Sequence, residues 1–189
     1  MASAYDYIWK LVVGGQGGVG KTTILYRFIH NEFLEDTKLT VGVQFHTQAL
    51  ERQNRKISLV LWDLGGQERF RFIQPEYVKG AVGAFICFDL SRYMTLEATR
   101  EWIAMFRQNA PGAPVVLVGT KLDLVEDNER QSIFDAANQM VQENGLLAFV
   151  PTSAKLGLNV TECIHYMVDT LLYNVYFSAQ GGGGGTATN

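Results

Sequence analysis

The chain has 189 residues, of which 47% are hydrophobic and 19% charged, and its formal net charge is −3. That length is enough for one domain with a full hydrophobic core. The weak negative charge, without a dense Lys/Arg cluster, argues against a protein that binds nucleic acid through phosphate contacts. Cys87 and Cys163 lie far apart in apolar segments, so we expect buried free thiols in a reducing, cytoplasmic compartment.

The sequence also carries no signal for membrane attachment. Its apolar stretches stay short of the about 18 residues that a membrane-spanning helix needs. The first residues lack the pattern of a secretory signal, and residues 186–189 offer no cysteine for prenylation. We therefore expect a soluble monomer without a membrane anchor.

Segments typical of strands and helices alternate along the chain, which predicts an α/β fold with helices on both faces of one sheet. A turn at Gln53-Asn54 is expected to join an antiparallel strand pair at one edge of a mostly parallel sheet. Strands are expected at residues 8–13, 45–51, 56–62, 83–88, 114–119 and 147–150. Helices are expected at residues 24–29 and 129–144, the second ending at Gly145. A further helix is expected to begin with Thr95 as its cap and to end before Pro111, and the last one to begin at Val160.

The last helix has two apolar faces. Its core face is expected to hold Val160, Cys163, Ile164, Met167, Leu171 and Val175. Another set is aromatic: Tyr166, Tyr173, Tyr176 and Phe177. This set either packs against the neighbouring sheet and helix or forms a patch that binds a partner. We expect one domain over residues 1–177 and a flexible Gly-rich tail over residues 178–189.

Residues 15–22 read Gly-Gln-Gly-Gly-Val-Gly-Lys-Thr, the G-x-x-x-x-G-K-[ST] pattern of a phosphate-binding loop. An apolar strand precedes the loop and a helix follows it, which is the context that the motif requires. The glycines let backbone N–H groups point at phosphates, and the helix N-terminus adds its own N–H groups and dipole. Lys21 is expected to reach the outer phosphates, and the Thr22 hydroxyl to bind Mg²⁺.

Further polar residues follow other predicted strands or precede them. Thr40 offers a hydroxyl to Mg²⁺ and an N–H to the terminal phosphate, and Asp63, at a strand end, offers a carboxylate to the metal. Gly66 leaves its N–H free to approach the phosphate. Gln67 has both a carbonyl and an amide, so it is expected to orient an attacking water.

Two short motifs late in the chain predict recognition of guanine. In Thr120-Lys121-Leu122-Asp123, the carboxylate matches the paired N1–H and N2–H₂ donors of guanine, a pair that adenine lacks. In Ser153-Ala154-Lys155, a small residue lets a backbone N–H meet the guanine O6. All these residues would converge outside the carboxyl ends of the strands, where open α/β sheets bind ligands.

In this order, the motifs resemble those of a small GTPase of the Ras superfamily over residues 6–177. Within the superfamily, residues 41–45 and 67–70 are most similar to the Rab branch. The resemblance implies an α/β P-loop NTPase G domain: six strands, mostly parallel, with one antiparallel edge strand and helices on both faces. It implies GTP or GDP with Mg²⁺ as cofactors, and a molecular switch that slowly hydrolyses GTP to GDP and phosphate.

The resemblance also implies which residues act. Catalytic residues are expected to be Lys21, Thr40 and Gln67, and metal ligands Thr22, Thr40 and Asp63. Phe33 matches a ring that packs against guanine in this family, or it is a core residue at a helix end. Nucleotide contacts are expected from Gly15, Gly17, Gly18, Val19, Gly20, Lys21, Thr22, Thr23, Phe33, Thr40, Gly66, Thr120, Lys121, Asp123, Ser153, Ala154 and Lys155.

Protein partners are implied as well. Phe45, Trp62 and Tyr77 match an aromatic triad that effectors of Rab proteins recognise; the alternative is plain packing. Loops at about residues 33–43 and 64–80 are expected to order around the terminal phosphate and to relax after hydrolysis. Residues 31–45 contain no arginine, so a GTPase-activating protein is expected to supply one. An exchange factor is expected too.

The chain departs from the family pattern at four places. Thr120 stands where Asn is usual, although Asp123 keeps the guanine contact. Gly65-Gly66 replaces Ala-Gly and resembles the Arf branch, and Leu39 replaces a common Pro. The paired cysteines that anchor Rab proteins to membranes are missing from the sequence.

Two other functions remain open from the sequence. One is a P-loop ATPase or nucleotide kinase, which Asp123 and Ala154 disfavour because they fit guanine. The other is a scaffold protein that holds GTP without hydrolysing it, against which Gln67 and Thr40 speak.

Overall fold

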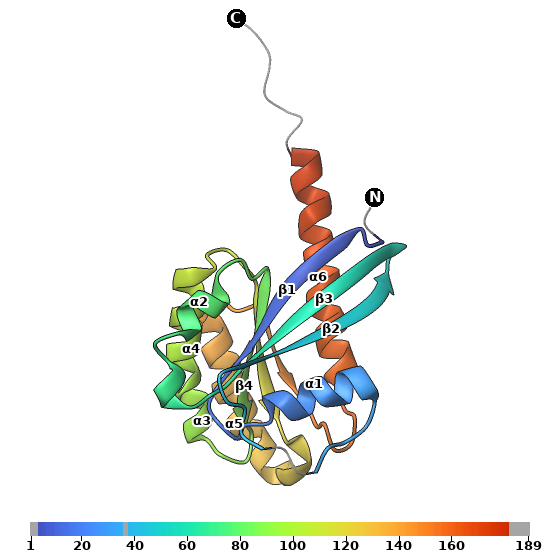
Figure 1. Ribbon diagram of the computed structural model, residues 1–189. Helices are drawn as coiled ribbons and strands as arrows, with labels where there is room; N and C mark the ends of the chain where they lie inside the picture. The colour runs from blue at the N-terminus through green and yellow to red at the C-terminus, as the bar shows by residue number, and fades with distance from the viewer. Residues whose placement is uncertain (1–3, 36–37, 182–189) are drawn as a thin grey trace, which may run out of the picture.

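The computed structural model describes residues 4–35 and 38–181. Its centre is a six-stranded sheet in the order β2-β3-β1-β4-β5-β6 (Figure 1). The β2–β3 pair is antiparallel and all other pairs are parallel, which confirms the predicted sheet. The strands are β1 (Tyr7–Gly14), β2 (Val43–Arg52), β3 (Arg55–Leu64), β4 (Gly83–Asp89), β5 (Val115–Thr120) and β6 (Ala148–Pro151).

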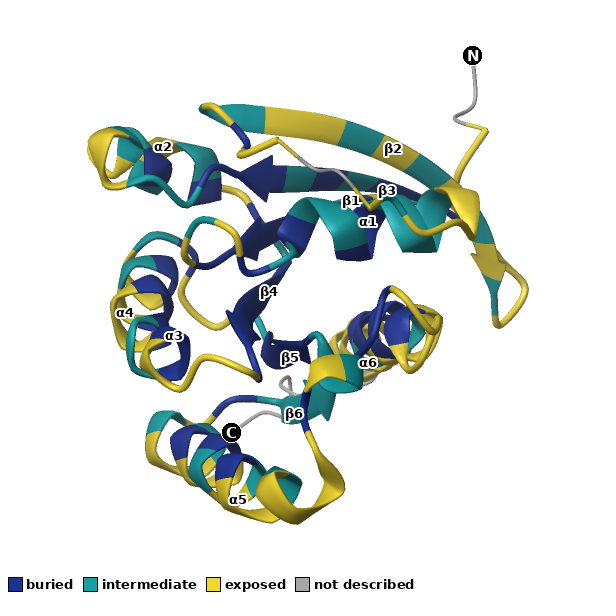
Figure 2. Ribbon diagram, turned by 90° about the horizontal axis from the view of Figure 1, so that it is seen from below, coloured by how far each residue is buried: buried dark blue, intermediate teal, exposed yellow. Residues whose placement is uncertain are grey.

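Helices cover both faces of the sheet (Figure 2). One core cluster joins the sheet to α2, α3, α4 and α5, and a second joins its other face to α1 and α6. Every residue of β4 and β5 is buried between these layers, which explains their unbroken apolar sequences. The helices are α1 (Lys21–His30), α2 (Gln74–Val78), α3 (Met94–Glu97), α4 (Thr99–Asn109), α5 (Asp127–Asn144) and α6 (Val160–Gly181), with short 3₁₀ helices η1 (Glu68–Phe70) and η2 (Leu122–Leu124).

Two predicted chain reversals are confirmed by their backbone angles. Gln53 and Asn54, between β2 and β3, have φ of 50° and 58°, the left-handed pair that a tight hairpin requires. Gly145 has φ of 54° and ends α5, where its N–H bonds to the Gln142 carbonyl.

The prediction that Thr95 caps a long helix is wrong. The helix begins at Met94, so Thr95 lies within its first turn, and the chain breaks at Ala98 into α3 and α4. The buried Thr95 hydroxyl instead lies 2.9 Å from the Asp89 amide N and 2.7 Å from the Arg92 carbonyl. It therefore closes the turn after β4 rather than capping a helix.

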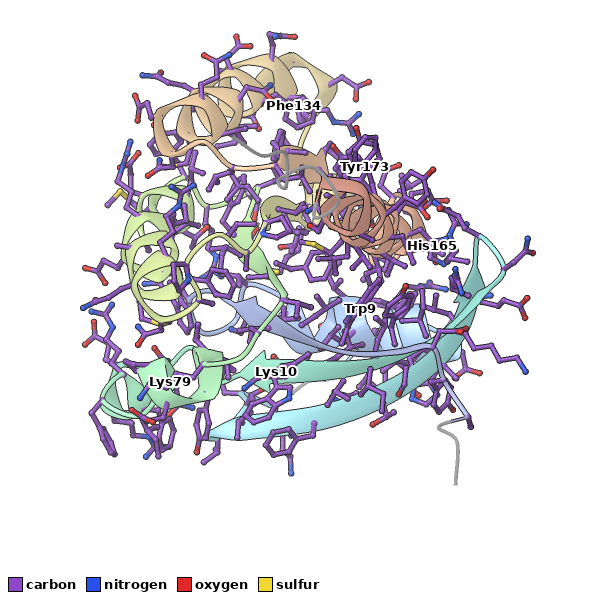
Figure 3. The ribbon with its side chains drawn as sticks, turned by 90° about the horizontal axis from the view of Figure 1, so that it is seen from above. Trp9, Lys10, Lys79, Phe134, His165 and Tyr173 are labelled. Carbon is purple, nitrogen blue, oxygen red and sulfur yellow. The ribbon has the colours of Figure 1, made fainter. Side chains whose placement is uncertain are left out.

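Helix α6 projects beyond the end of the sheet (Figure 1). Its predicted core residues up to Leu171 are buried, but Val175 is 38% exposed, so its assignment to the core is wrong. The four aromatic residues are 44–60% exposed, and Tyr173 lies on an outer face of the helix (Figure 3). These side chains are therefore only partly covered by the domain, and a partner patch stays a prediction.

The predicted tail lies mostly outside the described residues. Residues 178–181 belong to α6, four residues past the predicted domain end at 177, and residues 182–189 are not described. In the described part of the chain, no helix has the length and apolarity needed to cross a membrane. Both cysteines are free and buried, as expected, and burial raises the pKa of Cys87 to about 12.

Candidate functional site

A cleft of about 370 Å³ opens where β1, β3, β5 and β6 end. Most of the predicted site residues line it: Gly17, Gly18, Gly20, Lys21, Thr22, Thr23, Phe33, Thr40, Gly66, Gln67, Thr120, Lys121, Asp123, Ala154 and Lys155. The other four lie buried around it, namely Gly15, Val19, Asp63 and Ser153. Segments up to about 140 positions apart in the sequence thus meet at one edge of the sheet, as the motifs predict.

The phosphate-binding loop connects β1 to α1. Gly15 has φ of 133°, and a Cβ there would lie 2.2 Å from the Cys87 carbonyl oxygen, so only glycine fits. Lys21 is 5% exposed, and its ammonium donates to the Gly15 carbonyl at 2.8 Å and the Gln16 carbonyl at 2.9 Å. Burial lowers the pKa of Lys21, opposed by the charge of Asp63. The loop thus folds around one buried cation.

Three oxygen-bearing side chains meet beside that cation. The Thr22 and Thr40 hydroxyls lie 2.8 Å apart, and they lie 2.5 and 3.3 Å from Oδ2 of Asp63. Asp63 is fully buried, and its Oδ1 has no hydrogen-bond partner within the described residues. Burial raises the pKa of Asp63, although the hydroxyls and Lys21 oppose the shift. A buried carboxylate oxygen without a partner, next to two hydroxyls, is a donor set suited to a hard cation.

Gly66 and Gln67 line the cleft beside the phosphate-binding loop. A Cβ on Gly66 would lie 2.3 Å from the Gly17 amide N and 2.4 Å from the Gly15 carbonyl O. Its backbone therefore approaches the phosphate-binding loop in a way that other residues do not allow. Gln67 lines the cleft beside it and precedes the short helix η1.

The loops after β5 and β6 form the base end of the cleft, which is the end where the motifs predict the base to bind. The Ser153 hydroxyl donates to Oδ1 of Asp123 at 2.5 Å and so orients this carboxylate. The Thr120 hydroxyl lies 2.5 Å from the Val19 carbonyl and 3.0 Å from the Phe88 carbonyl. Thr120 therefore ties the base end to the phosphate-binding loop.

Arg27 is a supporting residue that sequence reasoning missed. It lies on α1 and donates from Nε to the Ala154 carbonyl at 2.6 Å and from Nη2 to the Lys155 carbonyl at 2.9 Å. Holding these carbonyls fixes the orientation of the loop that carries the predicted O6 contact. No local motif marks this arginine, because its partners lie 127 and 128 positions away.

The three predicted effector-binding aromatic residues do pack on one another. The Phe45 and Trp62 rings are 4.5 Å apart and nearly perpendicular, and Trp62 and Tyr77 are 6.0 Å apart. Phe45 nevertheless stays 56% exposed. Lys10, not foreseen from the sequence, lies with its ammonium 3.5 Å from the Trp62 ring centre and donates to the Lys79 carbonyl (Figure 3). The cluster thus combines packing with an exposed aromatic face.

A third feature that the sequence analysis missed lies at the end of β4. Asp89 is 1% exposed and pairs with Lys121 and Arg92. Burial acts to raise the pKa of Asp89, but hydrogen bonds from Lys121, Ser91 and Arg92 outweigh it and leave the pKa below its usual value. The available signal was a carboxylate that ends an apolar segment typical of a strand, as Asp63 does.

Comparison with known proteins identifies the family. The Ras family model matches residues 10–173. Ras-related protein Rab-4B of Homo sapiens is 37% identical over 176 residues, which cover 93% of this chain and 81% of that protein. Ras-related protein Rab-11A of Dictyostelium discoideum is 38% identical over 172 residues, which cover 90% of this chain and 78% of that protein. Ras-related protein RABA2d of Arabidopsis thaliana is 36% identical over 173 residues, which cover 91% of this chain and 76% of that protein.

The residues matched by the family model include residues 15–22, the cluster of Thr22, Thr40 and Asp63, and the loops after β5 and β6. These matches decide between the predicted GTPase and the alternatives of an ATPase, a nucleotide kinase or a scaffold that does not hydrolyse GTP. The chain belongs to the Ras family of small GTPases, molecular switches that bind guanine nucleotides and hydrolyse GTP.

Proposed function

We propose that the cleft beside residues 15–22 is where this protein binds GTP and GDP together with Mg²⁺ and hydrolyses GTP slowly. The observation that carries the proposal is the cluster of Thr22, Thr40 and Asp63 next to the buried ammonium of Lys21. A cation site beside a cationic phosphate site is what a metal–nucleotide complex requires.

The residues present fit Mg²⁺. Hydroxyl and carboxylate oxygens are the ligands this hard cation prefers, and the buried Oδ1 of Asp63 lacks a partner within the described chain. Thr22 and Thr40 would hold the ion, with Asp63 behind them. When bound, the metal neutralises charge on the phosphate oxygens.

The chain's own groups would do the rest by positioning. Lys21 and the loop N–H groups hold the phosphates. The carboxylate of Asp123 accepts the two guanine donors, while Ala154 leaves room for a backbone N–H at O6. The amide of Gln67 orients the attacking water, with its carbonyl accepting and its amide donating.

Replacing Gln67 with leucine tests the last of these roles. The side chain keeps its size but loses both polar atoms that would hold the water, so the single-turnover rate of GTP hydrolysis should fall about 10- to 100-fold. Gln142→Leu, at an exposed position on α5, is the matched control and should keep the wild-type rate. Hydrolysis by Gln67→Leu at the wild-type rate would remove Gln67 from the mechanism.

The switch loops are proposed at about residues 33–43 and 64–80, since Thr40 and Gly66 line the cleft from these segments. We expect amide hydrogen exchange in both to be slower with a non-hydrolysable GTP analogue than with GDP. Strand β5, fully buried, is the internal reference. Equal exchange in both nucleotide states would refute the assignment of these loops.

Protein partners would bind the same two switch loops. We propose that effectors bind the GTP form through the switch loops and the exposed ring of Phe45 in a cytoplasmic, monomeric protein. An exchange factor and a GTPase-activating protein would act at the cleft. A partner that binds the GTP-loaded protein and not the GDP-loaded protein should then fail to bind GTP-loaded Phe45→Ala. If the variant still bound this partner, the Phe45 ring would be excluded from effector recognition.

A further inference from the structure

Asp89 is the centre of a compact network next to the phosphate-binding loop. Its Oδ1 accepts from the Ser91 amide at 3.0 Å and the Ser91 hydroxyl at 2.7 Å. Its Oδ2 accepts from Nε of Arg92 at 2.9 Å and from the Lys121 ammonium at 2.7 Å. Four donors therefore satisfy this buried carboxylate, and the hydrogen bonds keep its pKa low enough for it to be ionised at neutral pH.

Both cations held by Asp89 reach on to the same carbonyl of the loop. Nη2 of Arg92 and Nζ of Lys121 each donate to the Gly18 carbonyl at 3.1 Å. The next carbonyl, that of Val19, lies 2.5 Å from the Thr120 hydroxyl. Two consecutive loop carbonyls are thus held by side chains from the segments that follow β4 and end β5.

Holding a carbonyl also orients the N–H of the following residue. The C=O and N–H of one trans peptide point in opposite directions. Drawing the Gly18 carbonyl toward Arg92 and Lys121 therefore turns the Val19 N–H away from them. A phosphate-binding loop works through such N–H groups directed at the anion.

The backbone that carries Arg92 is itself fixed. The Arg92 amide bonds to the Asp89 carbonyl at 2.9 Å, and the Thr95 amide bonds to the Arg92 carbonyl at 2.9 Å. Thr95 is 4% exposed, and its hydroxyl closes the same turn. The guanidinium therefore comes from a rigid turn and bridges a buried carboxylate and the loop.

We propose that Arg92, oriented by Asp89, is a positioning residue that presets the phosphate-binding loop for the nucleotide and slows nucleotide release. This inference rests on the proposed function of the cleft. The guanidinium acts through the Gly18 peptide, and Arg92 is not among the described residues that line the cleft. Lysine cannot replace it fully, because Arg92 reaches its two partners from two nitrogens of one rigid plane, Nε to Asp89 and Nη2 to Gly18, whereas a lysine side chain carries a single ammonium.

The test compares Arg92→Ala and Arg92→Lys with the wild type and with Arg100→Ala. Arg100 is an exposed arginine on α4 that also pairs with two carboxylates, Glu97 and Glu143, so its removal controls for lost surface charge. The readout is the dissociation rate of fluorescently labelled GDP in Mg²⁺. Thermal unfolding of the nucleotide-free proteins shows whether each variant is folded.

We expect Arg92→Ala to release GDP about five- to tenfold faster than the wild type. The variant loses one charge-assisted hydrogen bond to the loop, and solvent weakens this bond because the Arg92 side chain is partly exposed. Arg92→Lys should fall between this variant and the wild type, and Arg100→Ala should match the wild type. Release from Arg92→Ala within twofold of Arg100→Ala would overturn the inference. An unchanged release rate with slower hydrolysis would overturn it too, because Arg92 would then act on the phosphates directly. A wild-type protein that binds no GDP would instead overturn the proposed function of the cleft.

Discussion

Replacing Lys21 with alanine is expected to weaken the affinity for GTP and for GDP by about a thousandfold. The ammonium of Lys21 is the buried cation around which the loop folds. Without it, the phosphates lose a charge-assisted partner, and the Gly15 and Gln16 carbonyls lose their donor. Equilibrium titration with fluorescently labelled GDP measures the change.

Lys56→Ala is the matched control for this variant. Lys56 is exposed at the start of β3, at the end of the sheet opposite the cleft, so its loss should leave the affinity unchanged. A Lys21→Ala protein that is folded and binds GDP within tenfold of the wild type would contradict the assigned role.

Replacing Asp123 with alanine is expected to abolish the preference for guanine over adenine. Two hydrogen bonds from the base to one carboxylate are lost, which should lower the affinity for GTP by about a thousandfold. The weak affinity for ATP should stay as it is, because adenine has no paired donors for this carboxylate to accept. Competition of GTP and of ATP against labelled GDP measures both affinities.

Asp127→Ala is the control, since Asp127 is an exposed carboxylate four positions on that pairs with Arg130. It should retain the full preference for GTP. If Asp123→Ala kept the wild-type ratio of GTP to ATP affinity, base recognition would have to come from other groups.

The residues proposed to bind the nucleotide and the metal could be found from the sequence because each has a short local pattern. The loop at residues 15–22, Asp63-Leu64-Gly65-Gly66-Gln67 and Thr120-Lys121-Leu122-Asp123 each follow a recognisable strand. In a parallel sheet the carboxyl ends of the strands lie at the same edge, so the fold class alone predicts that the segments after these strands lie close together. For this reason, the fold and most of the cleft-lining residues could be predicted.

The supporting residues could not be found in this way, because their partners are distant in the chain. Arg27 contacts carbonyls more than 120 positions away, and Arg92 contacts Gly18 across 74 positions. Lys10 lies in an apolar strand, where nothing in the local pattern indicates a contact with the Trp62 ring. Such contacts depend on the register of neighbouring strands, which periodicity alone does not give.

Two other differences come from geometry beyond the periodic pattern. Val175 continues the apolar pattern of α6, yet it is 38% exposed. The last part of this helix extends beyond the end of the sheet (Figure 1), where the sheet no longer covers its apolar face. Gly65 was noted as a departure from the family, and the structure supplies a reason. A Cβ at Gly65 would lie 2.6 Å from the Thr40 carbonyl, so glycine lets the segment before β2 pack closely here.

The central claim is that this cleft binds guanine nucleotide with Mg²⁺ and converts GTP to GDP. The most direct measurement loads the purified protein from an equal mixture of GTP and ATP, with Mg²⁺ or with EDTA. At timed intervals the protein is freed of unbound nucleotide and denatured, and the released nucleotides are separated. We predict retention of guanine nucleotide alone with Mg²⁺, appearing first as GTP and then slowly as GDP, and little retention or conversion with EDTA. Retention of ATP, or conversion at the same rate in EDTA, would contradict the account.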